Sequence, residues 1–68
     1  MEKETKIVLA VNGQRALYLF TREYDDYKQV EFVVAYWDKS VNVGDYVDGW
    51  SCGHYFYNLE DAVEYLNR

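Results

Sequence analysis

The chain has 68 residues, of which half are apolar and 19% are aromatic, a composition that supports one hydrophobic core and excludes a disordered chain. A single cysteine excludes an internal disulfide, and no apolar run approaches the roughly 20 residues that a membrane-spanning helix needs. Twelve acidic and seven basic residues give a net charge of −5, which disfavours direct binding to nucleic acid.

The first predicted element is a β-hairpin. Residues 5–11 are rich in β-branched side chains and end at Asn12-Gly13, a pair that tolerates the positive φ of a type I′ turn. A second strand is predicted from about Gln14 to Arg22. Its middle part, residues 16–20, is apolar at every position, so both of its faces are either covered or available for contact.

A second hairpin is predicted next. Its loop is Glu23-Tyr24-Asp25-Asp26-Tyr27, in which the two aspartates favour a turn. Residues 28–37 predict a third strand, and neither face of that strand is cleanly polar.

The region that follows is predicted to be less regular. Residues 38–45 are rich in turn formers and predict a long connection, with a short β segment at residues 41–43. A fourth strand is expected within residues 50–57, where Gly49 and Gly53 indicate a bulge or a sharp bend.

The end of the chain predicts a helix. Asn58 is a favourable N-cap, and Glu60 and Asp61 place two acids in the first turn, where the helix dipole favours them. Apolar residues recur at i, i+3, i+4 and i+7 and form one stripe: Leu59, Ala62, Val63 and Leu66.

Together these elements predict one α+β domain over residues 1–68, an antiparallel β-meander of three to four strands packed against one C-terminal helix. The unpaired thiol and the lack of an export signal predict a cytoplasmic protein that is not bound to a membrane. One short helix cannot cover the whole sheet, so part of the aromatic set should be exposed and should carry the function: Tyr18, Tyr24, Tyr27, Tyr36, Trp37, Trp50 and Tyr55.

One short segment contains the candidate residues for catalysis or metal binding. Cys52 and His54 lie two residues apart on the fourth strand, which is loose for a thiolate and imidazole pair, and the segment has no obvious third catalytic group. With Asp45 and Asp48 they match no zinc or calcium spacing. A buried free thiol beside a surface histidine accounts for the segment, and we expect neither an enzyme nor a bound metal or cofactor.

The aromatic sheet could instead stack nucleic-acid bases, with Tyr18 and Tyr36 as the natural pair on adjacent strands. Such platforms normally lie in a positively charged groove, whereas the basic residues of this chain are scattered among acids. Charge therefore favours a protein partner with a basic surface over nucleic acid, unless the acidity only keeps a small protein soluble.

The tail from Gly53 to Leu66, an aromatic strand that runs into a capped Leu-Glu-Asp-Ala helix, resembles the ends of small acidic proteins of phages and mobile elements. Some proteins of that kind, such as anti-CRISPR and antirestriction proteins, block host nucleases with acidic side chains. The resemblance implies an inhibitor of a host nucleic-acid-handling complex, and it carries over no specific residue.

The resulting hypothesis is a non-enzymatic binding protein. The expected contact residues combine the acidic loop with aromatic residues of the sheet: Glu23, Tyr24, Asp25, Asp26, Tyr27, Tyr18, Tyr36 and Trp37. The alternative is a structural or interaction domain that self-associates, for example as a homodimer, through an uncovered sheet face or an edge strand.

Overall fold

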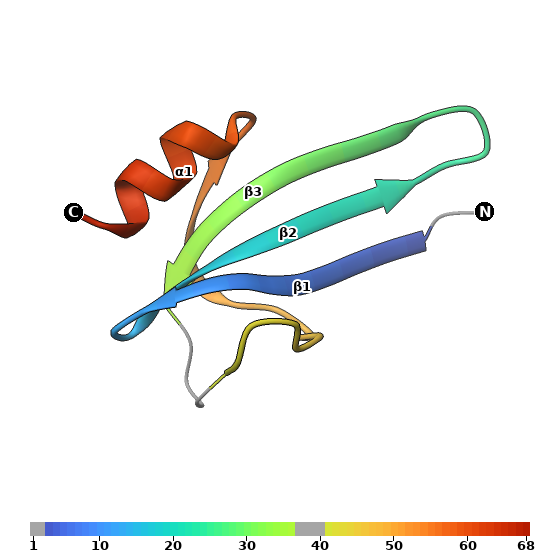
Figure 1. Ribbon diagram of the computed structural model, residues 1–68. Coiled ribbons are helices and arrows are strands. Elements are labelled where there is room, and N and C mark those ends of the chain that lie inside the picture. Colours follow the sequence, from blue (N-terminus) through green and yellow to red (C-terminus); the bar gives the residue numbers. More distant parts are fainter. Residues whose placement is uncertain (1–2, 37–40) are drawn as a thin grey trace.

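A computed structural model describes residues 3–36 and 41–68 of the chain. Its elements, in chain order, are β1 (Lys3–Asn12), β2 (Arg15–Glu23), β3 (Lys28–Tyr36), β4 (Ser51–Phe56) and α1 (Leu59–Leu66). The four strands form one antiparallel sheet in the order β1-β2-β3-β4, and α1 lies at one end of it (Figure 1). The predicted α+β meander with a C-terminal helix is confirmed.

The β1–β2 hairpin has the predicted position and a different turn. Asn12 pairs with Arg15, so the two loop residues are Gly13 and Gln14. Gly13 has a φ of 65°, and Gln14 is not among the residues with positive φ. A type I′ turn needs positive φ at both loop residues, whereas a type II′ turn needs it only at the first. The hairpin therefore fits a type II′ turn with the glycine at its first position.

α1 covers one face of the sheet. Ala62 and Leu66 are buried against Leu17 of β2 and Val34 of β3. The end of the helix is held by the β1–β2 hairpin, where the Asn12 side-chain amide donates a hydrogen bond to the Leu66 carbonyl at 2.9 Å. Arg15 donates to the carbonyl of Tyr65 at 3.1 Å. The first bond satisfies a carbonyl of the last helical turn, and the second adds to the bond that the Tyr65 carbonyl accepts from the Arg68 amide.

The start of α1 is fixed by its N-cap. Asn58 has an extended backbone, and its side-chain oxygen accepts a hydrogen bond from the Glu60 amide at 2.7 Å, as predicted. We expect Asn58→Ala to lower the free energy of unfolding by about 0.5 to 2 kcal/mol, measured by urea denaturation. Asn58→Asp, which keeps the acceptor, should unfold close to wild type. Equal losses for the two variants would contradict the cap.

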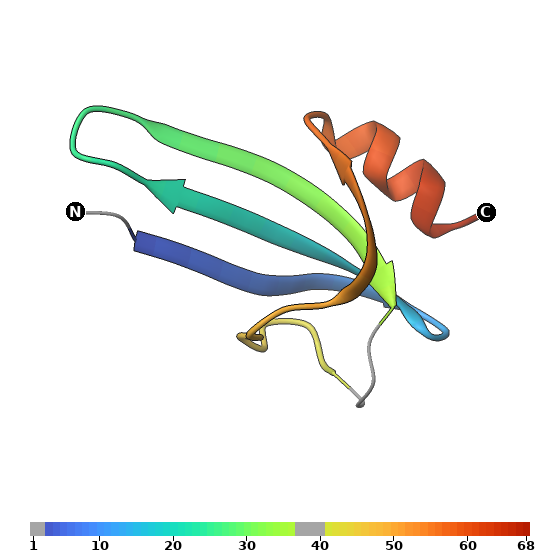
Figure 2. The ribbon, with the colours of Figure 1, turned by 180° about the vertical axis from the view of Figure 1, so that it is seen from behind.

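The opposite face of the sheet is covered by residues 41–50, which we call the strap. Three of its side chains pack over the core of this face: Val41, Val47 and Trp50. Its backbone is hydrogen-bonded to the outer edge of β1, with the Val47 amide donating to the Lys6 carbonyl at 3.0 Å and the Gly44 amide donating to the Val8 carbonyl at 2.8 Å. Figure 2 shows the chain then crossing this face toward β4.

The strap corrects two expectations. The predicted β segment at 41–43 is absent from the described part of this region, and the isolated bridge that does form joins Ile7 and Tyr46. The far face of the sheet was expected to remain uncovered because the chain has one helix. A loop anchored by Trp50 covers it instead, so less aromatic surface is exposed than the element count suggests.

The ends of β1, β2 and β3 nearest the β2–β3 loop extend beyond both covers (Figure 1). They form an arm that ends in the β2–β3 loop, at the opposite end of the molecule from α1 (Figure 1). The molecule is correspondingly elongated, with extents of 37 × 24 × 19 Å. This arm places the predicted contact loop far from both cores.

Candidate functional site

The hairpin tip, residues 23–27, contains five of the eight predicted contact residues. Asp25 and Asp26 are exposed and lie between two tyrosines whose rings stack with centroids 4.5 Å apart. The amide of Tyr24 donates to the carbonyl of Tyr27 at 2.8 Å and closes the loop. The ring of Tyr27 is 57% exposed, so the tip presents an aromatic surface beside carboxylates.

The tip is held by paired strands up to its base. Glu23 pairs across the sheet with Lys3 on one side and with Lys28 on the other. Its carboxylate lies 3.8 Å from the Lys28 ammonium group, and Asp25 and Asp26 add two further carboxylates to the tip. The loop therefore follows directly on two hydrogen-bonded strands, which fix its position at the end of the sheet.

The remaining predicted contact residues lie elsewhere. Tyr18 is only 1% exposed, because the indole of Trp50 stacks on its ring with centroids 4.8 Å apart. Its expected exposure was wrong. Tyr36 is 49% exposed and lies at the other end of β3 from the tip. Trp37 lies outside the described residues. The predicted set is therefore not one surface.

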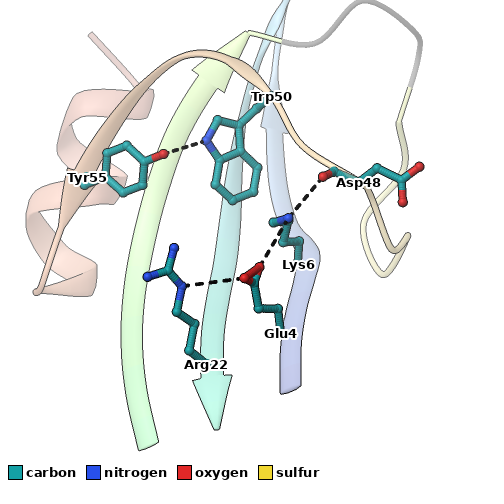
Figure 3. Close-up of polar contacts among 6 residues, drawn as sticks. All are labelled: Glu4, Lys6, Arg22, Asp48, Trp50 and Tyr55. Carbon is teal, nitrogen blue, oxygen red and sulfur yellow. Dashed lines mark hydrogen bonds and ion pairs between the residues drawn. The ribbon is translucent and has the colours of Figure 1, made fainter. Parts of the chain in front are cut away.

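Trp50 is the centre of the face that the strap covers (Figure 3). Its indole nitrogen donates to the hydroxyl of Tyr55 at 3.1 Å, and its ring meets Phe20 edge-on. Nearby charges are compensated, since the Glu4 carboxylate lies 3.6 Å from Lys6 and 3.9 Å from Arg22. With Tyr18 buried beneath Trp50, the base-stacking pair of Tyr18 and Tyr36 does not form.

The Cys52 to His54 segment departs from its predicted geometry. Cys52 is exposed rather than buried, with a φ of 55°, and the pairing of β3 with β4 is irregular at this point, as the glycines predicted. His54 lies against Tyr65 of α1, with ring centroids 4.7 Å apart. Within residues 3–36 and 41–68, no three His, Cys, Asp or Glu side chains are grouped to hold a metal ion.

Sequence reasoning missed a second surface feature, an open groove of about 350 Å³ between β4 and α1. Three of its lining side chains are rings and three are charged: His54, Phe56 and Tyr65, with Asp61, Glu64 and Arg68. The alternation of β4 and the i, i+4 spacing of α1 could have grouped these residues within each element. Neither pattern indicates that the two elements meet.

Comparison with protein-family models, curated proteins and solved structures finds no match. Among the described residues, no helix is long and apolar enough to cross a membrane. The two surfaces described above, the hairpin tip and the β4–α1 groove, are therefore the candidate functional sites of the chain.

Proposed function

We propose that the chain is a small, acidic, non-enzymatic binding protein that docks its hairpin tip on a basic surface of a protein partner. The observation that carries this proposal is the tip itself, where two exposed aspartates lie between two stacked tyrosines at the end of a strand-paired arm. Tyrosine provides large, rigid contact area, and carboxylates steer the approach of Lys- and Arg-rich surfaces.

The shape of the molecule supports a docking role. An arm that extends beyond both cores can enter a cleft in a partner while the rest of the domain stays outside that cleft (Figure 1). Nucleic-acid-binding clefts are basic, and a net charge of −5 complements them. With the resemblance of the C-terminal tail to proteins of phages and mobile elements, this favours a host nucleic-acid-handling complex as the partner and inhibition as the outcome.

The proposal is tested by reversing the tip charge. Asp25→Lys with Asp26→Lys should fold normally, because exposed loop substitutions usually change stability by about 0.5 kcal/mol or less. The matched control is Asp48→Lys with Glu60→Lys, which changes the net charge by the same amount on exposed side chains elsewhere. The three proteins serve as bait in host lysate, and mass spectrometry identifies the captured proteins.

We expect wild type and control to capture a partner that the tip reversal loses. With that partner in hand, the tip reversal should slow association by at least about tenfold at low ionic strength, and rising salt should slow the wild type toward the variant. Equal association rates for all three proteins would remove the tip from the interface. A wild-type rate that does not respond to salt would contradict electrostatic docking.

Self-association is a second candidate. It is favoured by β4, which is an edge strand of the sheet and carries the exposed Tyr55. Sedimentation velocity distinguishes it, because apolar or edge-strand association should persist or strengthen as salt rises. A dimer that tightens in salt, with no captured partner, would favour this candidate over the first.

A further inference from the structure

The β4–α1 groove combines aromatic rings with carboxylates. The ring of Tyr65 lies 4.7 Å from that of His54 and 5.6 Å from that of Phe56, with both pairs tilted by about 43° to 44°. Asp61 and Glu64 of α1 line the same groove. Rings attract a cation through their faces, and carboxylates attract it through charge, so the two kinds of lining select the same kind of ligand.

Two guanidinium groups of the chain already use this chemistry. The guanidinium carbon of Arg68 lies 5.8 Å from the centre of the Tyr65 ring, and one of its nitrogens lies 3.4 Å from a Glu64 oxygen. The guanidinium carbon of Arg15 lies 5.9 Å from the same ring. A guanidinium is planar and weakly hydrated, so it stacks on a ring and pairs with a carboxylate at once, whereas an ammonium group does this less well.

The side chains that line the groove also carry a net negative charge. Arg68 neutralises Glu64, whereas Asp61 has no ion-pair partner among the residues that the structure describes. The lining side chains therefore carry two carboxylates and one guanidinium. Because Arg68 and Arg15 already lie near the Tyr65 ring, an incoming guanidinium would displace Arg68 from the ring and from Glu64, and Asp61 would supply the second carboxylate of the site.

We infer that this groove binds the guanidinium group of an arginine side chain, stacked on Tyr65 and paired with Asp61. The inference deepens the proposed function, on which it relies only for the source of the arginine, a basic partner. The helix α1, which lines the groove, lies at the opposite end of the molecule from the hairpin tip (Figure 1), so the two sites can be tested separately.

The test uses N-acetyl-arginine amide as the probe and two-dimensional NMR of the whole chain as the readout. We expect saturable shifts of the His54, Phe56 and Tyr65 ring signals, with a dissociation constant on the order of 10 mM. The citrulline analogue, which is neutral and nearly isosteric, should give none. The lysine analogue at equal concentration should bind severalfold more weakly, and it controls for ionic strength.

Two variants test which side chains of the groove determine the affinity for the arginine probe. Asp61→Asn removes the counter-charge from an exposed position and should weaken arginine binding by about two- to fivefold. Arg68→Ala should strengthen it by a similar factor, because it frees Glu64 and one face of Tyr65. Linear shifts without saturation, equal binding of the citrulline or lysine analogue, or weaker binding by Arg68→Ala would each overturn the inference.

Failure of the groove is distinguishable from failure of the proposed function. The Asp25→Lys, Asp26→Lys protein should bind N-acetyl-arginine amide like wild type, since its changes are remote from the groove. Saturable binding together with unaltered partner capture by the tip reversal would contradict the tip and support the groove. If the tip reversal loses the partner and N-acetyl-arginine amide shows no saturable binding, docking through the tip would be supported and arginine binding in the groove would be overturned.

Discussion

Trp50→Ala is expected to lower the free energy of unfolding by about 2 to 4 kcal/mol, somewhat less than the loss for a fully buried aromatic residue, because Trp50 is partly buried. The free energy of unfolding of a 68-residue domain is roughly 3 to 10 kcal/mol in total. The variant should therefore be only marginally stable. The indole stacks on Tyr18, meets Phe20 edge-on and packs over the core of this face, so its removal exposes both rings.

Urea denaturation followed by far-ultraviolet circular dichroism measures this effect without relying on tryptophan fluorescence. Tyr55→Phe is the matched control, because it removes only the hydroxyl that accepts the indole hydrogen bond and should cost about 0.5 to 1.5 kcal/mol. A Trp50→Ala protein as stable as Tyr55→Phe would mean that the strap does not depend on the indole.

Gly53→Ala is expected to have the second largest effect, about 1 to 3 kcal/mol, from steric overlap rather than from lost contacts. A Cβ atom at Gly53 would lie 2.8 Å from the indole nitrogen of Trp50 and 3.2 Å from a Val33 methyl group, which is closer than ordinary packing allows. The indole cannot give way cheaply, because its other side lies on Tyr18.

The chain provides a closely matched control for this substitution. A Cβ atom at Gly49 would meet nothing within 4 Å, so Gly49→Ala should unfold close to wild type under the same denaturation assay. In a Trp50→Leu background the cost of Gly53→Ala should shrink, because the two residues are in contact and their effects are not additive. Equal losses of unfolding free energy in the two glycine variants would mean that the loss arises from the backbone rather than from overlap with the indole.

Local patterns predicted most of the fold. The position of the first hairpin, the existence of the strands, the irregular pairing near Gly53 and the cap at Asn58 all depend on residues close in sequence, and all are present in the structure. The helix differs in detail. Ala62 and Leu66 of its apolar stripe are buried, but Leu59 and Val63 are 46% and 39% exposed. A periodic pattern identifies a face, whereas the partner decides how much of it is covered.

The sites were predicted less well because they depend on contacts between distant segments. The acids and tyrosines of residues 23–27 could be located from one loop signal. The burial of Tyr18 could not, since it depends on a strap residue that arrives from far along the chain. The β4–α1 groove was missed for the same reason, because His54 and Tyr65 belong to different elements.

The pairing of the strap with β1 also has a consequence for how the chain folds. Both hairpins can form from neighbouring residues, whereas Lys6 reaches the carbonyl of Asp48 across 42 residues. Closing such a loop is entropically slow, so the strap should dock late. Until then the outer edge of β1 and the ring of Tyr18 are both open to other chains, which is the combination that promotes aggregation during synthesis. Docking of the strap covers both surfaces at once. A variant whose strap docks slowly would therefore aggregate more during folding, even if its folded state were as stable as that of the wild type.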